Sequence, residues 1–208
     1  MERFIALYRG INVGGRNPVK MESLRAMHVG LGQRAVTSFI QSGNIVFSAT
    51  GSAEKIARVL AAQFVEKIGF AVRVIVVPAA CWSAMVRNNP YAKFSAKLPQ
   101  TVHAGVCDGQ PSAPGLQALH KKVGGSETFV VKGELIYLHA PDGLGKSKFA
   151  AGMEKAGGVP ITLRNWRTIE VLWKMLDGDE TTTSPVLGEG GDPARKINSV
   201  GRRRSLQS

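Results

Sequence analysis

The sequence has few of the residues on which several common functional classes depend. Only two of its 208 residues are cysteines, Cys81 and Cys107, too few for a disulfide framework or a cysteine-rich metal site. No apolar run reaches the length of about 18 residues that is typical of a membrane-spanning helix. The N-terminal segment is interrupted by Glu2 and Arg3 and lacks the pattern of a secretory signal. We therefore expect a cytoplasmic protein with reduced cysteines and no membrane partner.

Several catalytic motifs are also absent. The four histidines lack metal-ligand spacing such as H-E-x-x-H, and there is no G-x-S-x-G nucleophile elbow. Asp142 is the only carboxylate within the segments singled out below, which disfavours a hydrolase with paired carboxylates. The third expected strand, at 44–48, lacks the K/R-G-aromatic signature of an RNA-recognition motif. The sequence predicts neither a metal nor a cofactor.

Basic residues, in contrast, are abundant. The net charge is +12, from 27 Lys and Arg against 15 Asp and Glu. From Gly178 onward there are five basic and four acidic residues, so the preceding part of the chain carries +11. A charge of this sign favours an anionic partner such as a phosphate, a nucleotide or a nucleic acid. The alternative is a general surface charge that maintains solubility.

Hydrophobic periodicity predicts alternating strands and helices in the first half of the chain. Ser52 is placed to cap a helix that Gly69 ends, and Ser42-Gly43 is typical of a tight hairpin turn. The β-branched run at 72–77 indicates a buried strand. The expected strands are 4–8, 36–41, 44–48 and 72–77, and the expected helices lie at 21–31, 52–68 and 79–87.

The same order of elements returns in the second half, roughly 90 residues later, which is the length of a small domain. The expected strands are 101–107, 128–131, 135–139 and 159–163, and the expected helices lie near 116–123, 147–156 and 168–176. The order β-α-β-β-α-β is the ferredoxin-like arrangement. We predict an α+β fold with two tandem ferredoxin-like units, 1–95 and 96–177, each with an antiparallel sheet and a following helix. Residues 178–208 lack periodicity and are interpreted as a flexible tail.

The connection from the first strand to the first helix is unusually long, and such ordered loops are often functional. Its glycines allow several backbone N–H groups to face one point and hold an anion, and its basic residues would add charge. The alternative is a wide glycine-rich turn fixed by Asn12. It is not a dinucleotide-binding fingerprint, because the second glycine is missing. The candidate binding residues here are Arg9, Gly10, Asn12, Gly14, Gly15 and Lys20.

A second polar segment, Gln41 to Asn44, contains the hairpin turn. In a ferredoxin-like unit the first and second strands end at the same edge of the sheet, so this turn and the 10–20 loop should be neighbours. We therefore expect a polar cleft that combines Arg9 and Asn12 with the candidate residues Gln41, Ser42 and Asn44.

Two further polar segments lie in the second unit. Gly145-Lys146-Ser147 resembles the end of a P-loop, but Ala140 stands where that motif needs glycine. A helix N-terminus with Lys146 nearby can still attract an anion. Trp166 lies between two arginines and suits stacking on a base, although anchoring the last helix to the core is the simpler interpretation. The candidates here are Asp142, Lys146, Arg164, Asn165, Trp166 and Arg167.

Together these four segments resemble one family, the domain-of-unknown-function 1697 family of bacterial proteins. The residues that carry the resemblance are 9–15, Lys20 and Met21, 41–44, 142–148 and 164–168, in that order. The resemblance runs from about Phe4 to Leu176 and implies an α+β fold of ferredoxin-like type and a bacterial origin. It implies no activity, because none is established for the family.

The leading functional hypothesis is a binding module for a phosphate-bearing ligand, a nucleotide or a nucleic acid. The second is an enzyme acting on an anionic small molecule, with Arg9, Asn12, Gln41 and Asn44 binding substrate and Asp142 or a histidine as the acid or base. The sequence offers no paired nucleophile and base for it. The third is a regulatory sensor or protein-interaction domain with a cleft between its two units.

Overall fold

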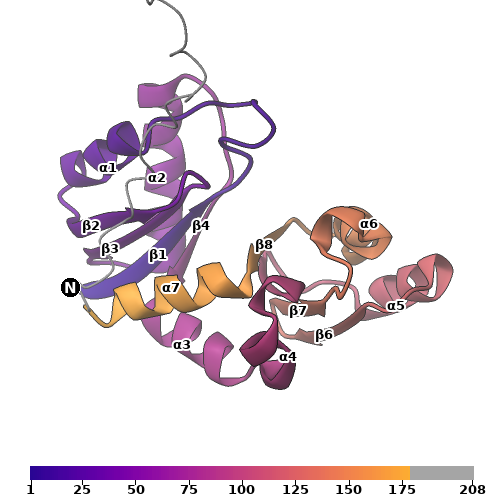
Figure 1. Ribbon diagram of the computed structural model, residues 1–208. Helices are drawn as coiled ribbons and strands as arrows, with labels where there is room; N and C mark the ends of the chain where they lie inside the picture. The colour runs from indigo at the N-terminus through magenta and orange to yellow at the C-terminus, as the bar shows by residue number, and fades with distance from the viewer. Residues whose placement is uncertain (179–208) are drawn as a thin grey trace, which may run out of the picture.

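The computed structural model describes residues 1–178 and contains two units of the same topology (Figure 1). The first consists of β1 (Glu2–Tyr8), α1 (Met21–Gly30), β2 (Arg34–Phe39), β3 (Asn44–Ala49), α2 (Ala53–Ile68) and β4 (Val74–Pro78). The second consists of β5 (Val102–Cys107), α5 (Ala113–Val123), β6 (Thr128–Lys132), β7 (Leu135–His139), α6 (Lys148–Gly157) and β8 (Ile161–Asn165). The antiparallel sheets have the orders β2-β3-β1-β4 and β6-β7-β5-β8. The predicted pair of ferredoxin-like units is confirmed.

Local signals in the sequence explain where several helices begin and end. The hydroxyl of Ser52 accepts a hydrogen bond from the backbone N–H of Lys55, and Gly69 ends α2 in a left-handed conformation at φ 95°. Asn165 caps the last helix, α7 (Trp166–Leu176), by accepting a hydrogen bond from the Arg167 N–H. These side chains satisfy backbone groups that a helix terminus leaves without partners.

The strand β2 differs from the prediction at both ends, because it begins at Arg34 and ends at Phe39. The pairing with β3 shifts register between Arg34 and Thr37, and Ala35 has a positive φ of 48°. This bulge interrupts the alternation of apolar and polar residues, so the start of the strand cannot be recognised from periodicity.

The connection between the units contains α3 (Ala79–Arg87) and α4 (Ala92–Lys97), followed by a short 3-10 turn, η1 (Pro99–Thr101). The helix α4 was not predicted, because it has six residues and lies between Pro90 and Pro99 without an apolar stripe. A second 3-10 turn, η2 (Leu144–Lys146), precedes α6.

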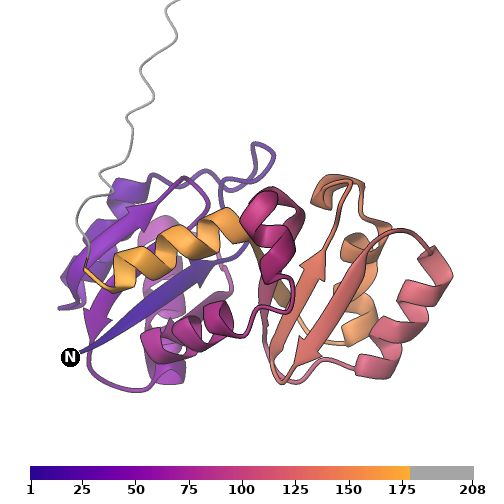
Figure 2. The same cartoon turned by 60° about the horizontal axis from the view of Figure 1, so that its bottom comes forward.

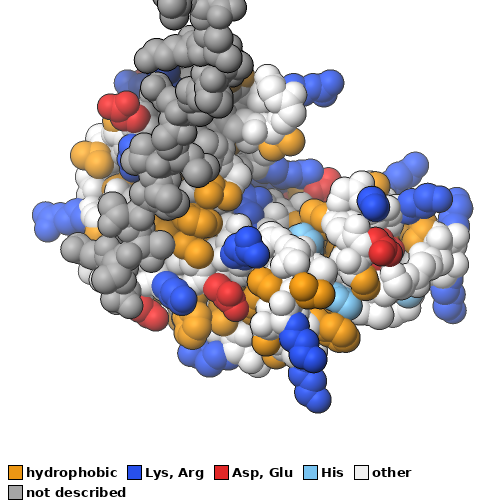
Figure 3. Space-filling view, in the orientation of Figure 1, with side chains coloured by type: hydrophobic (Ala, Val, Ile, Leu, Met, Phe, Trp, Pro, Cys, Tyr) orange, Lys and Arg blue, Asp and Glu red, His pale blue; other side chains and the backbone are white. Residues whose placement is uncertain are grey.

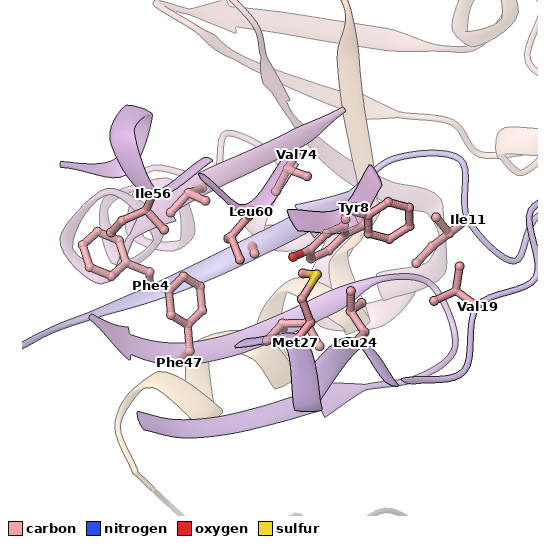
Figure 4. Close-up of a cluster of buried hydrophobic side chains, with 14 of the residues drawn as sticks. Phe4, Tyr8, Ile11, Val19, Leu24, Met27, Phe47, Ile56, Leu60 and Val74 are labelled. Atoms are coloured by element: carbon pink, nitrogen blue, oxygen red, sulfur yellow. The ribbon is translucent and has the colours of Figure 1, made fainter. Parts of the chain in front are cut away.

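The first sheet is buried on both faces, which explains why β1 is a continuous apolar run. Phe4 and Tyr8 point into the core beneath α1 and α2, where they meet Leu24 and Leu60 (Figure 4). On the opposite face Ile5 packs in a different core cluster, with residues from α3, α7 and the second sheet. A strand covered on both faces needs apolar side chains in both directions.

The last helix crosses from the second unit to cover the first. Figure 2 shows α7 lying along the first sheet beside α3. Arg3 donates to the Met175 carbonyl at 2.6 Å, and the indole N–H of Trp82 in α3 donates to the Ile169 carbonyl at 3.2 Å. The predicted boundary near residue 95 thus falls between the two sheets. Each unit has a core cluster of its own, and a third cluster, which includes Ile5, Trp82 and Ile169, is shared by both units.

Among residues 1–178, no helix combines the length and the apolar character needed to cross a membrane. The tail expected from residue 178 onward falls on residues 179–208, which lie outside the described part of the chain.

Candidate functional site

The 10–20 loop folds back on itself through its two central glycines. Gly14 and Gly15 both have positive φ, 57° and 75°, and the Arg16 N–H donates to the Val13 carbonyl at 3.0 Å. Two consecutive positive φ angles produce a tight reversal that favours glycine at both positions. At the base of the loop, the Asn17 amide donates to the Gly10 carbonyl at 3.0 Å. The loop is thus an ordered projection whose tip is exposed.

Asn12 fixes this loop to the hairpin turn. Its side-chain oxygen accepts from the Val19 N–H at 2.7 Å, and its amide donates to the carbonyls of Val19 and Gln41 at 2.9 and 2.8 Å. The loop and the turn are therefore neighbours, as the topology predicts. Both ends of the Asn12 amide are occupied by backbone groups, so Asn12 positions the loop.

Gly43 allows the turn to approach the end of β1 closely. Its carbonyl accepts from the Tyr8 N–H at 2.8 Å, and its φ is 73°. A Cβ atom at this position would lie 2.8 Å from the Tyr8 Cβ and from the Ile11 Cδ1, and 2.9 Å from the Tyr8 carbonyl oxygen. Only glycine fits this conformation and this space.

Arg164 of β8 joins the same turn from the second unit. Its Nε donates to the Asn44 Oδ1 at 2.7 Å, and its Nη2 donates to the Ser42 carbonyl at 3.2 Å. Asn44 is fully buried, and its own amide donates to the Ser42 hydroxyl at 2.8 Å. Burial lowers the pKa of Arg164 to about 10, and within residues 1–178 no carboxylate forms an ion pair with it. The Arg164 side chain therefore connects the units through neutral acceptors.

Two ion pairs also join an arginine of the first unit to a carboxylate of the second unit. Arg9 Nη2 lies 2.6 Å from a carboxylate oxygen of Glu154 in α6, and Glu154 also accepts from the Ile161 N–H at 2.9 Å. Arg73 pairs with Asp108. Arg9 is thus directed toward α6.

A groove of about 570 Å³ opens between the loop, the turn and the N-terminus of α1. It is lined by residues 18–22 together with Asn12, Arg25 and Gln41. Lys20 precedes the helix and forms no side-chain cap, so the first N–H groups of α1 receive no side-chain acceptor. Arg25 donates from Nη1 to the Ser38 hydroxyl at 2.6 Å, which holds its guanidinium beside β2. Of the five residues expected to form a polar cleft, only Asn12 and Gln41 line this groove.

Arg25 was missed by the sequence analysis. It lies inside α1, beyond the glycine-rich loop, and no motif distinguishes it. Its position five residues after Lys20 is a weak signal, because helical spacing does not by itself place two basic residues in one groove.

The candidate residues of the second unit are distributed over separate places. Asp142 accepts from the Ser126 hydroxyl at 3.2 Å, and Lys146 is exposed on η2. Trp166 is 3% exposed and donates from its indole to Glu170 at 2.9 Å, so it anchors α7 and has no face open to a base. Arg167 is exposed on α7. The structure therefore brings Arg164, but not the 142–148 segment, into hydrogen-bonding contact with the first unit's turn.

The histidines offer little for acid–base chemistry at the groove. His28 is buried between Tyr8, whose hydroxyl lies 2.8 Å from Nε2, and Gln33 on the other ring nitrogen. Burial lowers the pKa of His28 to about 4, which keeps the ring neutral at pH 7. His103 is also buried, with a pKa lowered by burial to about 4. Within the described residues, no cluster of three or more His, Cys, Asp or Glu could hold a metal ion.

Comparison with known proteins places the chain in a family. The family model described as "Protein of unknown function (DUF1697)" matches residues 1–137 of the 208. The chain belongs to the DUF1697 family. The match includes the 10–20 loop and the 41–44 turn, whereas the 142–148 and 164–168 segments lie beyond it. No curated protein matches the chain.

One solved structure extends the comparison beyond the range of the family model. The chain is similar to the conserved bacterial protein SP0830 from Streptococcus pneumoniae, with 25% sequence identity and a TM-score of 0.59. The similarity covers 84% of this chain and 98% of that protein, so both units of the DUF1697 member are included. Neither description names an activity or a ligand.

Proposed function

We propose that the protein is a binding module for a phosphate-bearing ligand, a nucleotide or a nucleic acid, and that the phosphate occupies the groove at the N-terminus of α1. The observation that carries this proposal is the convergence of Lys20, Arg25 and the uncapped start of α1 on one groove. Backbone N–H groups at a helix N-terminus and basic side chains beside them favour an anion. The volume lies within the usual range for small-molecule sites.

A second cavity in the described part of the chain is less suited to an anion. It measures about 670 Å³ and lies between α2 and β4 of the first unit and residues 107–109 and Glu134 of the second. Its charged residues are Arg58 and Arg73 against Glu54, Asp108 and Glu134, and Arg73 is already paired with Asp108. The groove at α1 contains two basic residues and one acidic residue, Glu22, so its charge favours a phosphate.

Binding is favoured over catalysis because the groove contains no pair of carboxylates and no histidine or cysteine. Glu22 is the one carboxylate among its lining residues, and no histidine or cysteine lies there. General acid–base catalysis needs a group with a tuned pKa within hydrogen-bonding distance of the reacting atom. We also propose that the protein acts in the cytoplasm, where its two free cysteines would remain reduced.

The proposal is tested by the thermal stability of the nucleic-acid-free protein with ATP, AMP, adenosine and inorganic phosphate. At a ligand concentration about 100-fold above Kd, binding to the native state adds about 2.7 kcal/mol and raises Tm by roughly 5–11 °C. We expect a shift with ATP or AMP that is lost in a Lys20→Gln/Arg25→Gln variant. The matched control is Arg58→Gln, which removes a basic charge at the other cavity.

Two outcomes contradict this site. In the first, none of the four compounds shifts Tm at low salt. In the second, the shift persists unchanged in the Lys20→Gln/Arg25→Gln variant. A shift that disappears in Arg58→Gln instead would assign the ligand to the cavity between the units.

A further inference from the structure

The short helix α4 carries an exposed aromatic side chain. Phe94 is 50% exposed, and no other aromatic residue between positions 1 and 178 belongs to the exposed class. One face of its ring stacks on His139 of β7, with the ring centroids 4.1 Å apart and the planes inclined by 23°. The Tyr91 ring also lies beside it, with the centroids 6.4 Å apart and the planes inclined by 56°, and half of the Phe94 surface remains exposed. Phe94 thus presents aromatic surface to solvent while its ring is stacked on the imidazole of His139.

This stack is fixed by the surrounding structure. His139 is 9% exposed and belongs to a central strand of the second sheet, and burial lowers its pKa, which favours the neutral ring. The Asn89 side chain accepts from the Tyr91 N–H at 2.9 Å and donates to the Ser95 hydroxyl at 3.0 Å, so it holds the start of α4. A rigid aromatic side chain loses little conformational freedom when a second ring stacks on it.

Basic side chains lie on α4 and just before it. Lys93 and Lys97 are exposed on α4, and Lys132 donates to the Asn88 carbonyl at 3.1 Å, just before the helix. Phe94 and Lys97 have the i, i+3 spacing of neighbours on one helix face, and Leu98, which follows the last residue of α4, is 53% exposed. Figure 3 shows hydrophobic side chains, a histidine and projecting basic side chains together in this region.

Nearby carboxylates do not neutralise this surface. In the turn after β7, Asp142 accepts from the Ser126 hydroxyl. The carboxylate of Glu127 lies near the turn at Gly125, where a Cβ would be 3.6 Å from it. Both acidic groups are therefore directed toward the turn that precedes β6. The net charge of +11 on residues 1–177 adds a long-range attraction for a polyanion.

We infer that α4 is a contact surface for single-stranded nucleic acid, in which one base stacks on the open face of Phe94 and the adjoining phosphates lie against Lys93 and Lys97. A base within a duplex has both faces covered by its neighbours, whereas an unpaired base offers a free face to an aromatic side chain. In this arrangement the lysines attract the anionic phosphate backbone, and the exposed Phe94 ring stacks on the base. This inference does not depend on the groove at α1, and the helices α1 and α4 lie well apart in Figure 1.

The test is fluorescence anisotropy with a 5′-fluorescein-labelled twelve-nucleotide oligouridylate. We expect Phe94→Ala to raise Kd by about 5- to 150-fold, the usual effect of removing one stacking side chain. Phe94→Trp should retain binding, and Phe94→Leu should lose it as Phe94→Ala does, because leucine keeps apolar volume without a π face. Val59→Ala, at a 42% exposed position of α2, is the matched control and should bind like the wild type.

Salt dependence tests the role of the lysines. Each phosphate contact to a single strand contributes about −0.7 to the slope of log K against log salt concentration. A Lys93→Gln/Lys97→Gln variant should therefore have a slope that is shallower by roughly 1.4. An unchanged slope would overturn the assignment of the phosphates to α4.

Three results would overturn the inference as a whole. One is the absence of saturable oligouridylate binding at low salt, and another is wild-type affinity in Phe94→Ala. The third is a protein that binds phosphatidylserine vesicles but not the oligonucleotide, and whose Phe94→Leu variant still binds the vesicles. This result would indicate that α4 contacts a membrane. Loss of oligonucleotide binding in Lys20→Gln/Arg25→Gln together with wild-type affinity in Phe94→Ala would support the groove and refute the α4 surface. If Phe94→Ala loses oligonucleotide binding and ATP and AMP cause no Tm shift that depends on Lys20 and Arg25, the α4 surface would be supported and the groove refuted.

Discussion

Replacing Arg164 with methionine tests whether its hydrogen bonds stabilise the connection between the two units. Methionine preserves most of the side-chain length and apolar stem but removes every donor. Three acceptors lose a partner: the Asn44 Oδ1 at 2.7 Å, the Leu163 carbonyl at 3.0 Å and the Ser42 carbonyl at 3.2 Å. Their environments differ, because Asn44 is fully buried whereas Ser42 and Leu163 are partly exposed.

The expected magnitude follows from these environments. The carbonyls of Ser42 and Leu163 lie at residues partly open to solvent, so water can replace their lost bonds at little cost. The buried Asn44 Oδ1 has Arg164 as its partner, and an unsatisfied buried acceptor costs about 1–3 kcal/mol. Removing a desolvated guanidinium offsets part of this cost. We therefore expect Arg164→Met to lower the free energy of unfolding by about 2 kcal/mol, equivalent to a decrease of roughly 4–8 °C in Tm.

Urea unfolding of a double-mutant cycle measures this effect. The cycle combines Arg164→Met with Asn44→Leu, so that the variant lacking both partners contains no orphaned acceptor. A coupling energy of about 1–2 kcal/mol is expected for residues in direct contact. If Arg164→Met is as stable as the wild type and the coupling energy is near zero, the desolvation free energy of the guanidinium cancels the free energy of its hydrogen bonds. The contact would then provide no stability to the interface.

Three further results are expected. Because burial lowers the pKa of His28 and His103 to about 4, below the ordinary value near 6.5, stability is full above about pH 7 and is lost as the pH falls toward 4. Urea unfolding should show a loss of roughly 2 kcal/mol per histidine between pH 7.5 and 5, and a flat profile would contradict the burial argument. Gly43→Ala should cost about 3 kcal/mol, since it combines backbone strain with a collision at Tyr8, whereas Gly32→Ala, at φ 77° with open space, should cost about 1–2 kcal/mol in the same assay. A chain that ends before α7 should bind the dye ANS and lose near-UV circular dichroism, because one face of the first sheet becomes uncovered; retention of a native near-UV spectrum would refute the shared core.

Much of the fold could be predicted because local signals and topology agree. The continuous apolar runs identified β1 and β4, and Ser52 and Gly69 marked helix ends that the structure confirms. Antiparallel pairing then placed the 10–20 loop beside the 41–44 turn without any knowledge of side-chain contacts. These inferences use only neighbouring residues and the geometry of a single unit.

Contacts between the units could not be predicted in the same way. The stripe of Ile169 and Leu172 shows that one face of α7 is buried, but periodicity does not identify the sheet that covers it. Glu154 was likewise an unremarkable helical residue until the structure paired it with Arg9. Such partners depend on how two separately recognisable units pack, and a single sequence carries no local signal for that packing.

The inter-unit contacts give the second unit a structural role at the groove of the first. Arg164 donates hydrogen bonds to Ser42 and Asn44 in the turn. Gln41, which precedes Ser42, lines the groove, and the Gln41 carbonyl accepts a hydrogen bond from Asn12. A chain of direct hydrogen bonds and covalent neighbours thus runs from β8 to the base of the 10–20 loop. Because Arg164 donates to neutral acceptors and not to a carboxylate, salt should weaken this connection less than it would weaken an exposed ion pair. The second unit thus supports one wall of the groove through the 41–44 turn, which is a physical reason for the two units to remain in one chain.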